Sequence, residues 1–240
     1  MTPPATSEPG PALDLLEVFR LRHRTREITL QPGAQRLLAF LAVQERPVQR
    51  AYVSGCLWPD TSQQHANANL RTTLWRLRRP DCRLVEVTAT ELGVAAGVRI
   101  DLREAAARAR RVLDRSPEPA DLDALVRAGD LLPDLDEGWV LIERERFRQL
   151  RLHALERLCE DLADAGRYAA ATEAGLAAVA AEPLRESAHR ALIRSHLAEG
   201  NVGEAARQYR FFCGLAHDQL HVPPSSRMQA LMASHVEVLR

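Results

Sequence analysis

Four arginines lie close together in a stretch of this sequence that contains no acidic residue. Residues 61–80 read TSQQHANANLRTTLWRLRRP and include Arg71, Arg76, Arg78 and Arg79 without one Asp or Glu. A guanidinium group donates several hydrogen bonds in a planar arrangement that matches a phosphate or the edge of a guanine base. Asn67 adds a side-chain amide, a group that can pair with adenine. These residue types favour contact with a nucleic acid.

The apolar residues of the same stretch predict the helix that positions the arginines. Ala66, Leu70, Leu74 and Leu77 recur at steps of four, four and three residues, which places them on one face of a helix. The opposite face then carries Asn67, Arg71, Thr72, Trp75, Arg78 and Arg79. Thr61 or Ser62 can cap the first turn, and Pro80 ends the helix because it lacks an N–H group. Such a helix suits the major groove of DNA, but a solvated basic surface would show the same pattern.

The charge of the chain is divided unevenly between its two halves. The 240 residues have a formal net charge of +0, and all 32 basic residues are arginine. Residues 1–112 contain 17 Arg against 11 acids, whereas residues 113–240 contain 15 Arg against 21 acids. A basic half followed by an acidic half fits a nucleic-acid module joined to a protein-binding module. The length is sufficient for two domains.

The remaining composition argues against several other classes of protein. The four cysteines (Cys56, Cys82, Cys159 and Cys213) form no CxxC pair, so we expect reduced thiols and neither a zinc site nor a disulfide framework. The sequence shows no apolar run of transmembrane length and no signal-peptide pattern at its N-terminus. We therefore expect a soluble, cytoplasmic, nucleoid-associated protein with no membrane partner. Nothing supplies a nucleophile–base pair or a metal cluster, so we expect no enzyme activity, no metal and no cofactor.

Short elements around the basic helix predict a winged helix-turn-helix. In chain order, the sequence predicts a disordered tail over 1–12, two or three antiparallel strands over 13–30, helices at about 34–45 and 50–57, and a hairpin formed by 83–87 and 93–100. The second helix would cross the DNA backbone while the basic helix lies in the major groove. Arg83, Thr88, Thr90 and Arg99 lie where the hairpin, as a wing, could reach phosphate or the minor groove.

The acidic half is predicted to be entirely helical. Helices are expected at 101–115, 121–132 and about 137–165, and a closing helix begins near 225. Leu158, Gly166 and Ala171 recur 34 residues later as Leu192, Gly200 and Ala205, which is the period of tetratricopeptide repeats. Such helix pairs stack into a continuous core and usually present a face to another protein. The predicted fold is therefore mainly α with a small β part: a winged helix-turn-helix domain over 13–100 and an all-α, tetratricopeptide-like domain over 101–240.

Three stretches give the chain a resemblance to a known family. They are LWPDTSQQHANANLRTTLWRLRR at 57–79, LLPDLDEGWVLIERERFRQLRLHALERL at 131–158 and PLRESAHRALIRSHLAEGNVGEAARQYR at 183–210. Together they resemble the bacterial transcriptional activators known as SARPs (Streptomyces antibiotic regulatory proteins) and their BTAD-domain relatives. The resemblance covers nearly the whole chain after the tail. It implies an OmpR-type winged helix followed by a tetratricopeptide-like bacterial transcriptional activation domain.

The resemblance also implies a function and a set of contacts. Such proteins bind direct repeats in promoters and recruit RNA polymerase, so the implied partners are double-stranded promoter DNA, the sigma or alpha subunit of RNA polymerase holoenzyme, and a second copy on DNA. The implied DNA contacts are Asn67, Arg71, Thr72, Trp75, Arg76, Arg78, Arg79, Thr88 and Arg99. The implied polymerase-contact loop comprises Trp58, Asp60, Thr61, Ser62 and Gln63. Trp75 departs from the family pattern, since many members have a small residue at this position.

A second hypothesis belongs to a different functional class. Winged helices can serve protein contacts alone, so the chain could be a tetratricopeptide-like adaptor whose winged helix no longer binds DNA. The acid-free face of residues 61–80 argues against this reading. The choice of an activator over a repressor rests on the resemblance alone.

Overall fold

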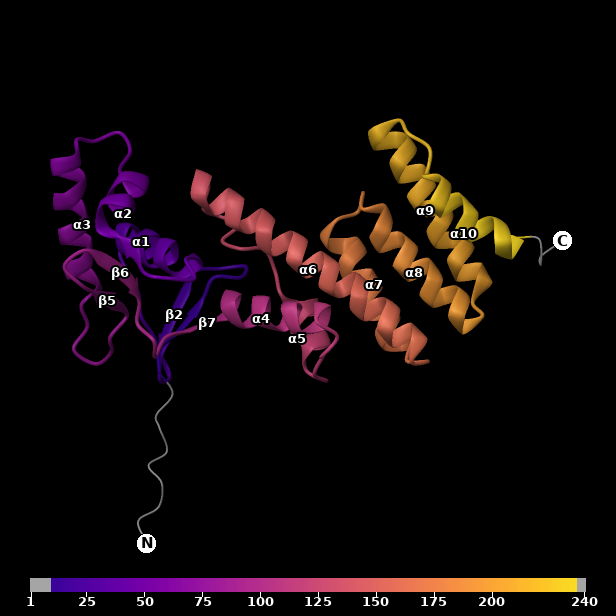
Figure 1. The fold of residues 1–240 in the computed structure, drawn as a ribbon, viewed down its shortest axis with the longest axis horizontal. Coiled ribbons are helices and arrows are strands. Elements are labelled where there is room, and N and C mark those ends of the chain that lie inside the picture. The colour runs from indigo at the N-terminus through magenta and orange to yellow at the C-terminus, as the bar shows by residue number, and fades with distance from the viewer. Residues whose placement is uncertain (1–9, 237–240) are drawn as a thin grey trace, which may run out of the picture. The chain divides into compact units, whose positions relative to one another are not determined.

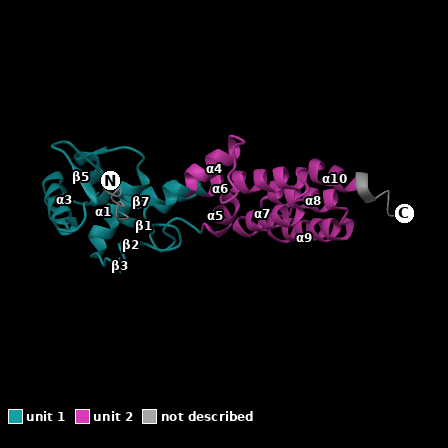
Figure 2. Cartoon of the chain, turned by 90° about the horizontal axis from the view of Figure 1, so that it is seen from below, with its two compact units in different colours: residues 1–104, 129–147 teal, residues 105–128, 148–240 magenta. Residues whose placement is uncertain are grey.

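The chain folds into two compact units, which the computed structural model describes over residues 10–236 (Figure 1). Unit 1 comprises the chain up to residue 104 together with 129–147, and unit 2 comprises 105–128 and the chain from 148 onward (Figure 2). Most of the predicted tail over 1–12 lies outside the described residues, although Ala12 already begins the first strand. The architecture confirms the predicted fold class, mainly α with small sheets.

Unit 1 contains the elements of a winged helix-turn-helix. In chain order they are β1 (Ala12–Asp14), β2 (Arg20–His23), β3 (Arg26–Glu27), α1 (Pro32–Val43), β4 (Val48–Gln49), α2 (Arg50–Leu57), α3 (Gln63–Leu77), β5 (Val85–Val87), β6 (Glu91–Val94) and β7 (Arg99–Ile100). One sheet has the strand order β3-β2-β1-β7 and the other has the order β4-β6-β5. The three predicted helices are therefore present, and β5 and β6 form the hairpin that follows them.

The predicted strand over 93–100 is wrong in its second half. Strand β6 ends at Val94, and the chain then turns, with the Val98 N–H donating to the Ala95 carbonyl at 3.0 Å. Beyond this turn β7 leaves the hairpin and pairs in parallel with β1, so that Arg99 lies opposite Ala12. The turn at the Ala96–Gly97 pair interrupts the ladder, because residues there are not extended.

Helix α1 contains the longest unbroken run of buried residues in unit 1. Every residue from Leu37 to Val43 is buried, and Phe40 is fully enclosed. The ring of Phe40 meets the edge of Trp139 with centroids 5.2 Å apart, a favourable aromatic geometry. The Arg103 guanidinium donates to the carbonyl of Gln44 at 2.6 Å and to that of Ala42 at 3.3 Å. These bonds satisfy acceptors that a helix leaves open at its C-terminal end.

Residues 129–147 return to unit 1 and pair with the segment after β1. The Glu17 N–H donates to the Asp130 carbonyl at 2.7 Å, and the Leu132 N–H donates to the Leu15 carbonyl at 2.9 Å. Gly129 allows this close approach, since a Cβ atom there would lie 2.0 Å from Cγ of Glu17. The helix predicted over 121–132 therefore ends earlier, at Arg127, because the residues that follow take an extended path along 15–17.

Unit 2 is helical and carries the predicted repeat. Its elements are most of α4 (Asp101–Leu113), α5 (Asp121–Arg127), the larger part of α6 (Gly138–Asp164), α7 (Tyr168–Ala181), α8 (Glu186–Glu199), α9 (Val202–Leu220) and α10 (Ser226–Val236). Gly166 and Gly200, 34 residues apart, end α6 and α8 with φ values of 72° and 88°. A side chain is strained at such angles, which explains the glycines. Ala171 and Ala205, at the same offset, are both fully buried, so the structure confirms a tetratricopeptide-like repeat.

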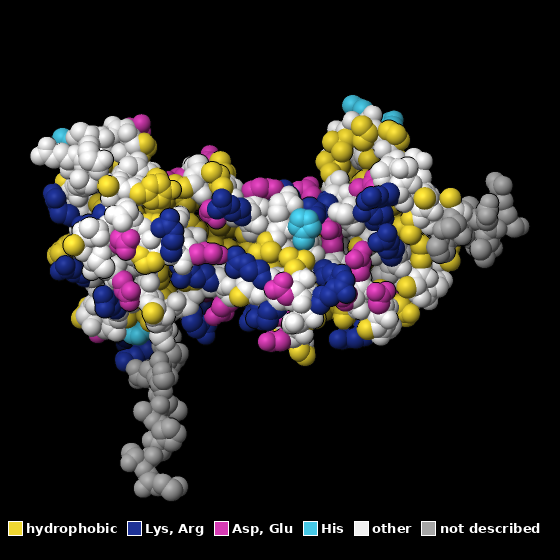
Figure 3. All heavy atoms as spheres, in the orientation of Figure 1, with side chains coloured by type: hydrophobic (Ala, Val, Ile, Leu, Met, Phe, Trp, Pro, Cys, Tyr) yellow, Lys and Arg dark blue, Asp and Glu magenta, His cyan; other side chains and the backbone are white. Residues whose placement is uncertain are grey.

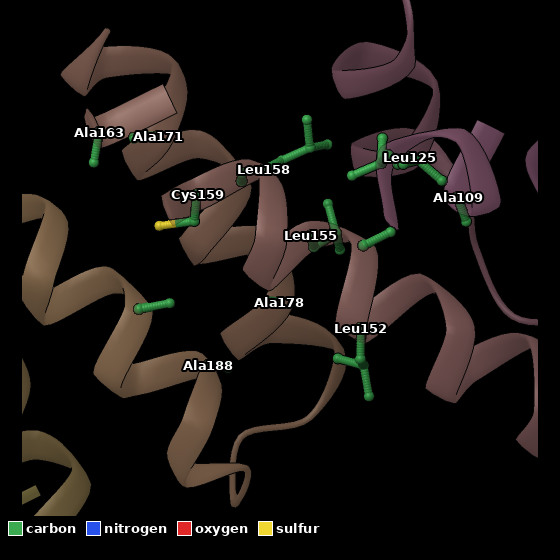
Figure 4. Close-up of a cluster of buried hydrophobic side chains, with 14 residues drawn as sticks. Ala109, Leu125, Leu152, Leu155, Leu158, Cys159, Ala163, Ala171, Ala178 and Ala188 are labelled. Carbon is green, nitrogen blue, oxygen red and sulfur yellow. The ribbon is translucent and has the colours of Figure 1, made fainter. Parts of the chain in front are cut away.

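Small residues let the helices of unit 2 approach closely. Figure 4 shows Leu155, Leu158 and Cys159 of α6 facing a core that also contains Ala171 and Ala178 of α7. Gly175 of α7 lies where a larger side chain would crowd its neighbours. A Cβ atom there would lie 3.0 Å from Leu192 Cδ1 and 3.1 Å from Cys159 Sγ. Burial raises the pKa of the Cys159 thiol to about 12, so this cysteine packs as a small apolar group.

Candidate nucleic-acid interface

Helix α3 holds one face in the core of unit 1 and leaves the other in solvent. Ser62 caps it as predicted, since its side chain accepts from the His65 N–H at 3.4 Å. The buried face consists of Ala66, Leu70, Thr73 and Leu77. Leu74 was predicted on this face, but it is only half-buried and Thr73 is buried beside it. The Thr73 hydroxyl donates to the Asn69 carbonyl at 2.8 Å, so its burial leaves no donor unpaired.

The opposite face of α3 presents the predicted side chains to solvent. Arg71, Thr72, Trp75 and Arg76 are all exposed, and Trp75 keeps 70% of its surface accessible. Asn67 is only half-buried, and its side-chain oxygen accepts from the Gln63 amide at 3.1 Å. The helix ends at Leu77, so Arg78 and Arg79 lie on the segment that leaves it. The structure therefore exposes Arg71, Thr72, Trp75 and Arg76 on α3 but places Arg78 and Arg79 beyond its end, and the contacts of all these residues with DNA stay a prediction.

A cavity of about 640 Å³ lies between α3 and the strand β5. Five arginines line it: Arg50, Arg71, Arg78, Arg79 and Arg83. The other lining residues are Trp75, Cys82 and aliphatic side chains, and no carboxylate is among them. Figure 3 shows basic side chains, in dark blue, over α3 and the β5–β6 hairpin, with acidic side chains of the hairpin, in magenta, beside them. A hollow with several positive charges and no negative one attracts a polyanion strongly.

The arginines of this surface differ from most others in the chain by having no acidic partner. Within residues 10–236, the side chains of Arg71, Arg76, Arg78, Arg79 and Arg83 form no ion pair or hydrogen bond. Many arginines elsewhere pair with acids, as Arg185 does with Glu156 and Arg157 with Asp161, at 2.6 Å in each case. The positive charge around α3 is thus available to a ligand.

The sequence prediction missed Arg50, which belongs to the same cavity. Arg50 begins α2 directly after β4, and its N–H donates to the carbonyl of Thr90 at 2.8 Å. This bond fixes the start of α2 against the hairpin. Strand β4 has only two residues, too few to show a periodic pattern, and it pairs with β6 more than forty residues later in the chain. No local signal in the sequence marks Arg50.

The structure separates the four predicted wing residues: Arg83 lines the cavity beside α3, Thr88 and Thr90 lie at the exposed hairpin turn, and Arg99 lies elsewhere. Thr88 is exposed at the hairpin turn, where its hydroxyl oxygen accepts from the Glu91 N–H at 2.9 Å. Arg99 lies outside the hairpin, in the other sheet, with its guanidinium 3.5 Å from the Glu104 carboxylate. The hairpin also carries Glu86, an exposed acid that faces solvent. Its contribution to an anion site therefore comes mainly from Arg83 at its base.

The predicted polymerase-contact loop is a short, ordered connection between α2 and α3. Trp58 is half-buried at the end of α2, and Asp60, Thr61 and Ser62 are exposed. The Thr61 hydroxyl donates to the Trp58 carbonyl at 3.1 Å, which holds the turn. Gln63, the first residue of α3, donates to the Ser54 hydroxyl at 2.8 Å. The loop therefore presents a fixed surface, and its contact with polymerase stays a prediction.

Two further observations concern other kinds of site. Among the residues that the structure describes, no group of three or more His, Cys, Asp or Glu side chains is placed to hold a metal ion. No helix in the described part of the chain is both long and apolar enough to cross a membrane. Burial and the neighbouring Asp81 raise the pKa of Cys82, and Arg79 opposes this, so its thiol remains protonated within the cavity at neutral pH.

Comparison with known proteins agrees with this architecture. The family model of the bacterial transcriptional activator domain (BTAD) matches residues 85–234. The chain is also similar to the solved structure of Mycobacterium tuberculosis EmbR in complex with a low-affinity phosphopeptide, with a TM-score of 0.64 and 18% identity over 93% of this chain. That likeness supports the fold, and the chain spans 64% of the length of the EmbR chain.

No curated protein sequence matches the chain significantly. The BTAD match, however, covers more than half of the 240 residues and runs from the hairpin of unit 1 to the last helix of unit 2. It confirms the resemblance that the three sequence stretches indicate. The chain therefore belongs to the family of bacterial regulators that contain a bacterial transcriptional activator domain.

Proposed function

We propose that the chain is a sequence-specific DNA-binding activator that binds promoter repeats and recruits RNA polymerase. The observation that carries this proposal is the cavity beside α3, which is lined by five arginines and no acid. Bacterial transcriptional activation is the general function of the family to which the chain belongs. Residues 13–100 would form the DNA-binding domain, completed by 129–147, and the helical repeats would form the activation domain.

In this proposal α3 enters the major groove and the cavity faces the DNA backbone. Arg71, Thr72 and Arg76 project from the solvent face of α3, where they would meet base edges. Arg78 and Arg79 follow the end of the helix and would neutralise phosphates together with Arg50 and Arg83. Asn67 and Thr88 would add contacts at the two ends of this surface. Arg99 would contribute less, because it lies in the other sheet beside Glu104.

The other proposed partner is the transcription machinery. The exposed loop with Asp60, Thr61 and Ser62 would contact the sigma or alpha subunit of RNA polymerase while α3 holds the promoter. The stacked helices of unit 2 would contact a second copy of the chain on the adjacent repeat or the polymerase itself. The protein would act in the cytoplasm at the nucleoid and would need no cofactor.

A selection from random double-stranded DNA tests the DNA-binding part of this proposal. The purified chain should enrich a motif, and it should bind that motif in the presence of excess competitor DNA. Arg71→Ala should weaken binding to the motif by about tenfold or more, because a base-reading arginine contributes on the order of 1–3 kcal/mol. The matched control is Arg127→Ala, which removes the same charge from an exposed ion pair in unit 2.

Two outcomes would count against the proposal. Equal weakening by the two substitutions would mean that α3 contributes only general charge. A selection that enriches no motif would favour the adaptor hypothesis, in which the winged helix serves protein contacts. Recruitment is tested separately by transcription from the selected site with purified polymerase, where Asp60→Ala should reduce transcription without reducing DNA affinity.

A further inference from the structure

Trp75 is the most exposed large apolar side chain among the described residues. It keeps 70% of its surface accessible, while the others of this kind range from 38% to 58%. Exposure of an indole to water is unfavourable, and burial of such a ring contributes strongly to binding. The backbone around it is a regular helix, so the exposure is not caused by local disorder in the fold. The side chain is placed to be buried by a ligand.

The neighbours of Trp75 on the same face of α3 also offer methyl groups to a ligand. Ala68 and Thr72 precede it by seven and three residues, which is the spacing of one helix face. The Thr72 hydroxyl donates to the Ala68 carbonyl at 3.1 Å, so its hydrogen is committed to the helix backbone. The methyl group of Thr72 is then the part that remains for a contact. These three residues form a short apolar strip along an otherwise polar face.

Arginines flank this apolar strip on both sides. Arg71 and Arg76 are exposed, and neither has an acidic partner within the described residues. Trp75 also lines the cavity that contains Arg78 and Arg79. A protein partner with an apolar patch would leave these charges unpaired, whereas DNA supplies phosphates and guanine edges to them. Charge complementarity therefore indicates DNA as the occupant.

Within the major groove of DNA, one base offers an apolar group. Thymine carries a C5-methyl group there, while the other bases present hydrogen-bond donors and acceptors. We propose that Trp75, with the methyl group of Thr72, reads the C5-methyl groups of one or two thymines and is a specificity-determining residue. This inference rests on the proposed DNA-binding function. It states which bases of the DNA site α3 would select.

Replacement of thymine by deoxyuridine tests the inference, because it removes the C5-methyl group and leaves base pairing unchanged. The full chain is first used to select its site from random DNA, and each thymine of that site is then replaced singly. At one or two positions the affinity should fall about fourfold, the change that corresponds to the burial of one methyl-sized group. At the other thymines the affinity should not change.

Variants of the protein assign this penalty to a side chain. Trp75→Ala should lose most of the difference between the thymine and deoxyuridine sites, because only the methyl group of Thr72 then remains, and Trp75→Phe should keep more of it. Arg71→Ala should bind both sites more weakly and keep the fourfold ratio, since it removes a charge and leaves the indole in place. Because Trp75 is mostly solvent-exposed, its substitution should leave the unfolding temperature unchanged.

The outcomes separate this inference from the proposed function. A selected site with no thymine penalty, or a penalty that persists in full in Trp75→Ala, overturns the thymine reading and leaves DNA binding standing. A penalty that persists in full would show that another residue contacts the methyl group. A selection that returns no motif overturns the proposed function and the inference together.

Discussion

His189 provides a pH-dependent test of the core of unit 2. The side chain is fully buried, and its ring lies 4.7 Å from that of Phe212. Its Nε2 lies 2.8 Å from the Pro183 carbonyl, which can only accept, so Nε2 carries the hydrogen. Its Nδ1 then accepts from the Gln208 amide at 2.8 Å. Burial lowers the pKa of His189, although the Pro183 carbonyl and the Glu186 carboxylate oppose this shift.

The sign of the effect follows from this lowered pKa. The unfolded chain protonates His189 near pH 6.5, whereas the folded chain binds that proton only at lower pH. The contribution of His189 to the free energy of unfolding is therefore fully present above pH 6.5, and it is lost as the pH falls below that value. Between pH 7.5 and pH 5.5 the free energy of unfolding should therefore decrease, and the part due to this one residue stays below about 1.4 kcal/mol, the limit that one proton sets over this range. His196, whose pKa burial also lowers, adds to the loss in the same direction.

His189→Gln isolates the contribution of this residue. The new amide can still donate to the Pro183 carbonyl but does not titrate, so the loss of stability between the two pH values should be smaller than in wild type. The measurement is urea unfolding followed by far-UV circular dichroism. Fluorescence serves as an internal control, because Trp58, Trp75 and Trp139 all lie in unit 1.

His153→Gln is the matched control, since it makes the same replacement at an exposed histidine on α6. An equal loss of stability in wild type and His189→Gln would refute the reasoning. It would mean that His189 gains its proton as easily in the folded chain as in the unfolded one.

Two further predictions concern the packing of each unit. Phe40→Ala should lower the stability of unit 1 by about 3–5 kcal/mol, because it empties a fully buried site and removes the contact with Trp139. The fluorescence-detected transition measures this loss, and a change below about 1 kcal/mol would contradict the packing. Gly175→Ala should destabilise unit 2 by about 1–3 kcal/mol, since the added Cβ atom would crowd Leu192 and Cys159. Circular dichroism during urea unfolding measures it, and a stabilising effect would show that the helices can separate freely.

The sequence predicts those elements that are determined by residues close to one another in the chain. The apolar spacing of residues 66–77 predicts α3, and a serine directly before it predicts the cap that the structure contains. The repeat of Gly166 and Gly200 predicts two helix ends, because each position needs a left-handed backbone angle. On the inner face of α3, Thr73 is buried where Leu74 was predicted to be, which shows the limit of this reasoning. A hydroxyl bonded to its own helix can be buried, and no polarity pattern shows that bond.

Long-range pairing accounts for the features that the sequence did not predict. The two residues of β4 become a strand only through β6, and this pairing brings Arg50 into the cavity. Arg99 leaves the hairpin because β1, more than eighty residues earlier, pairs with β7. The return of residues 129–147 to unit 1 depends on contacts such as that of Arg36 with Glu137, whose Nη2 and Oε2 atoms lie 2.8 Å apart. None of these pairings leaves a periodic pattern in the local sequence.

The dependence of DNA affinity on salt is the measurement that decides most directly whether the arginine surface binds DNA. The six arginines that surround α3 and the cavity are Arg50, Arg71, Arg76, Arg78, Arg79 and Arg83. If four of them, Arg50, Arg78, Arg79 and Arg83, each neutralise one phosphate, log K should fall with log[salt] with a slope of about −4. Arg78→Ala should reduce the magnitude of this slope by about one, and Arg127→Ala should leave it unchanged. A slope near zero, or equal slopes for wild type and Arg78→Ala, would contradict the account.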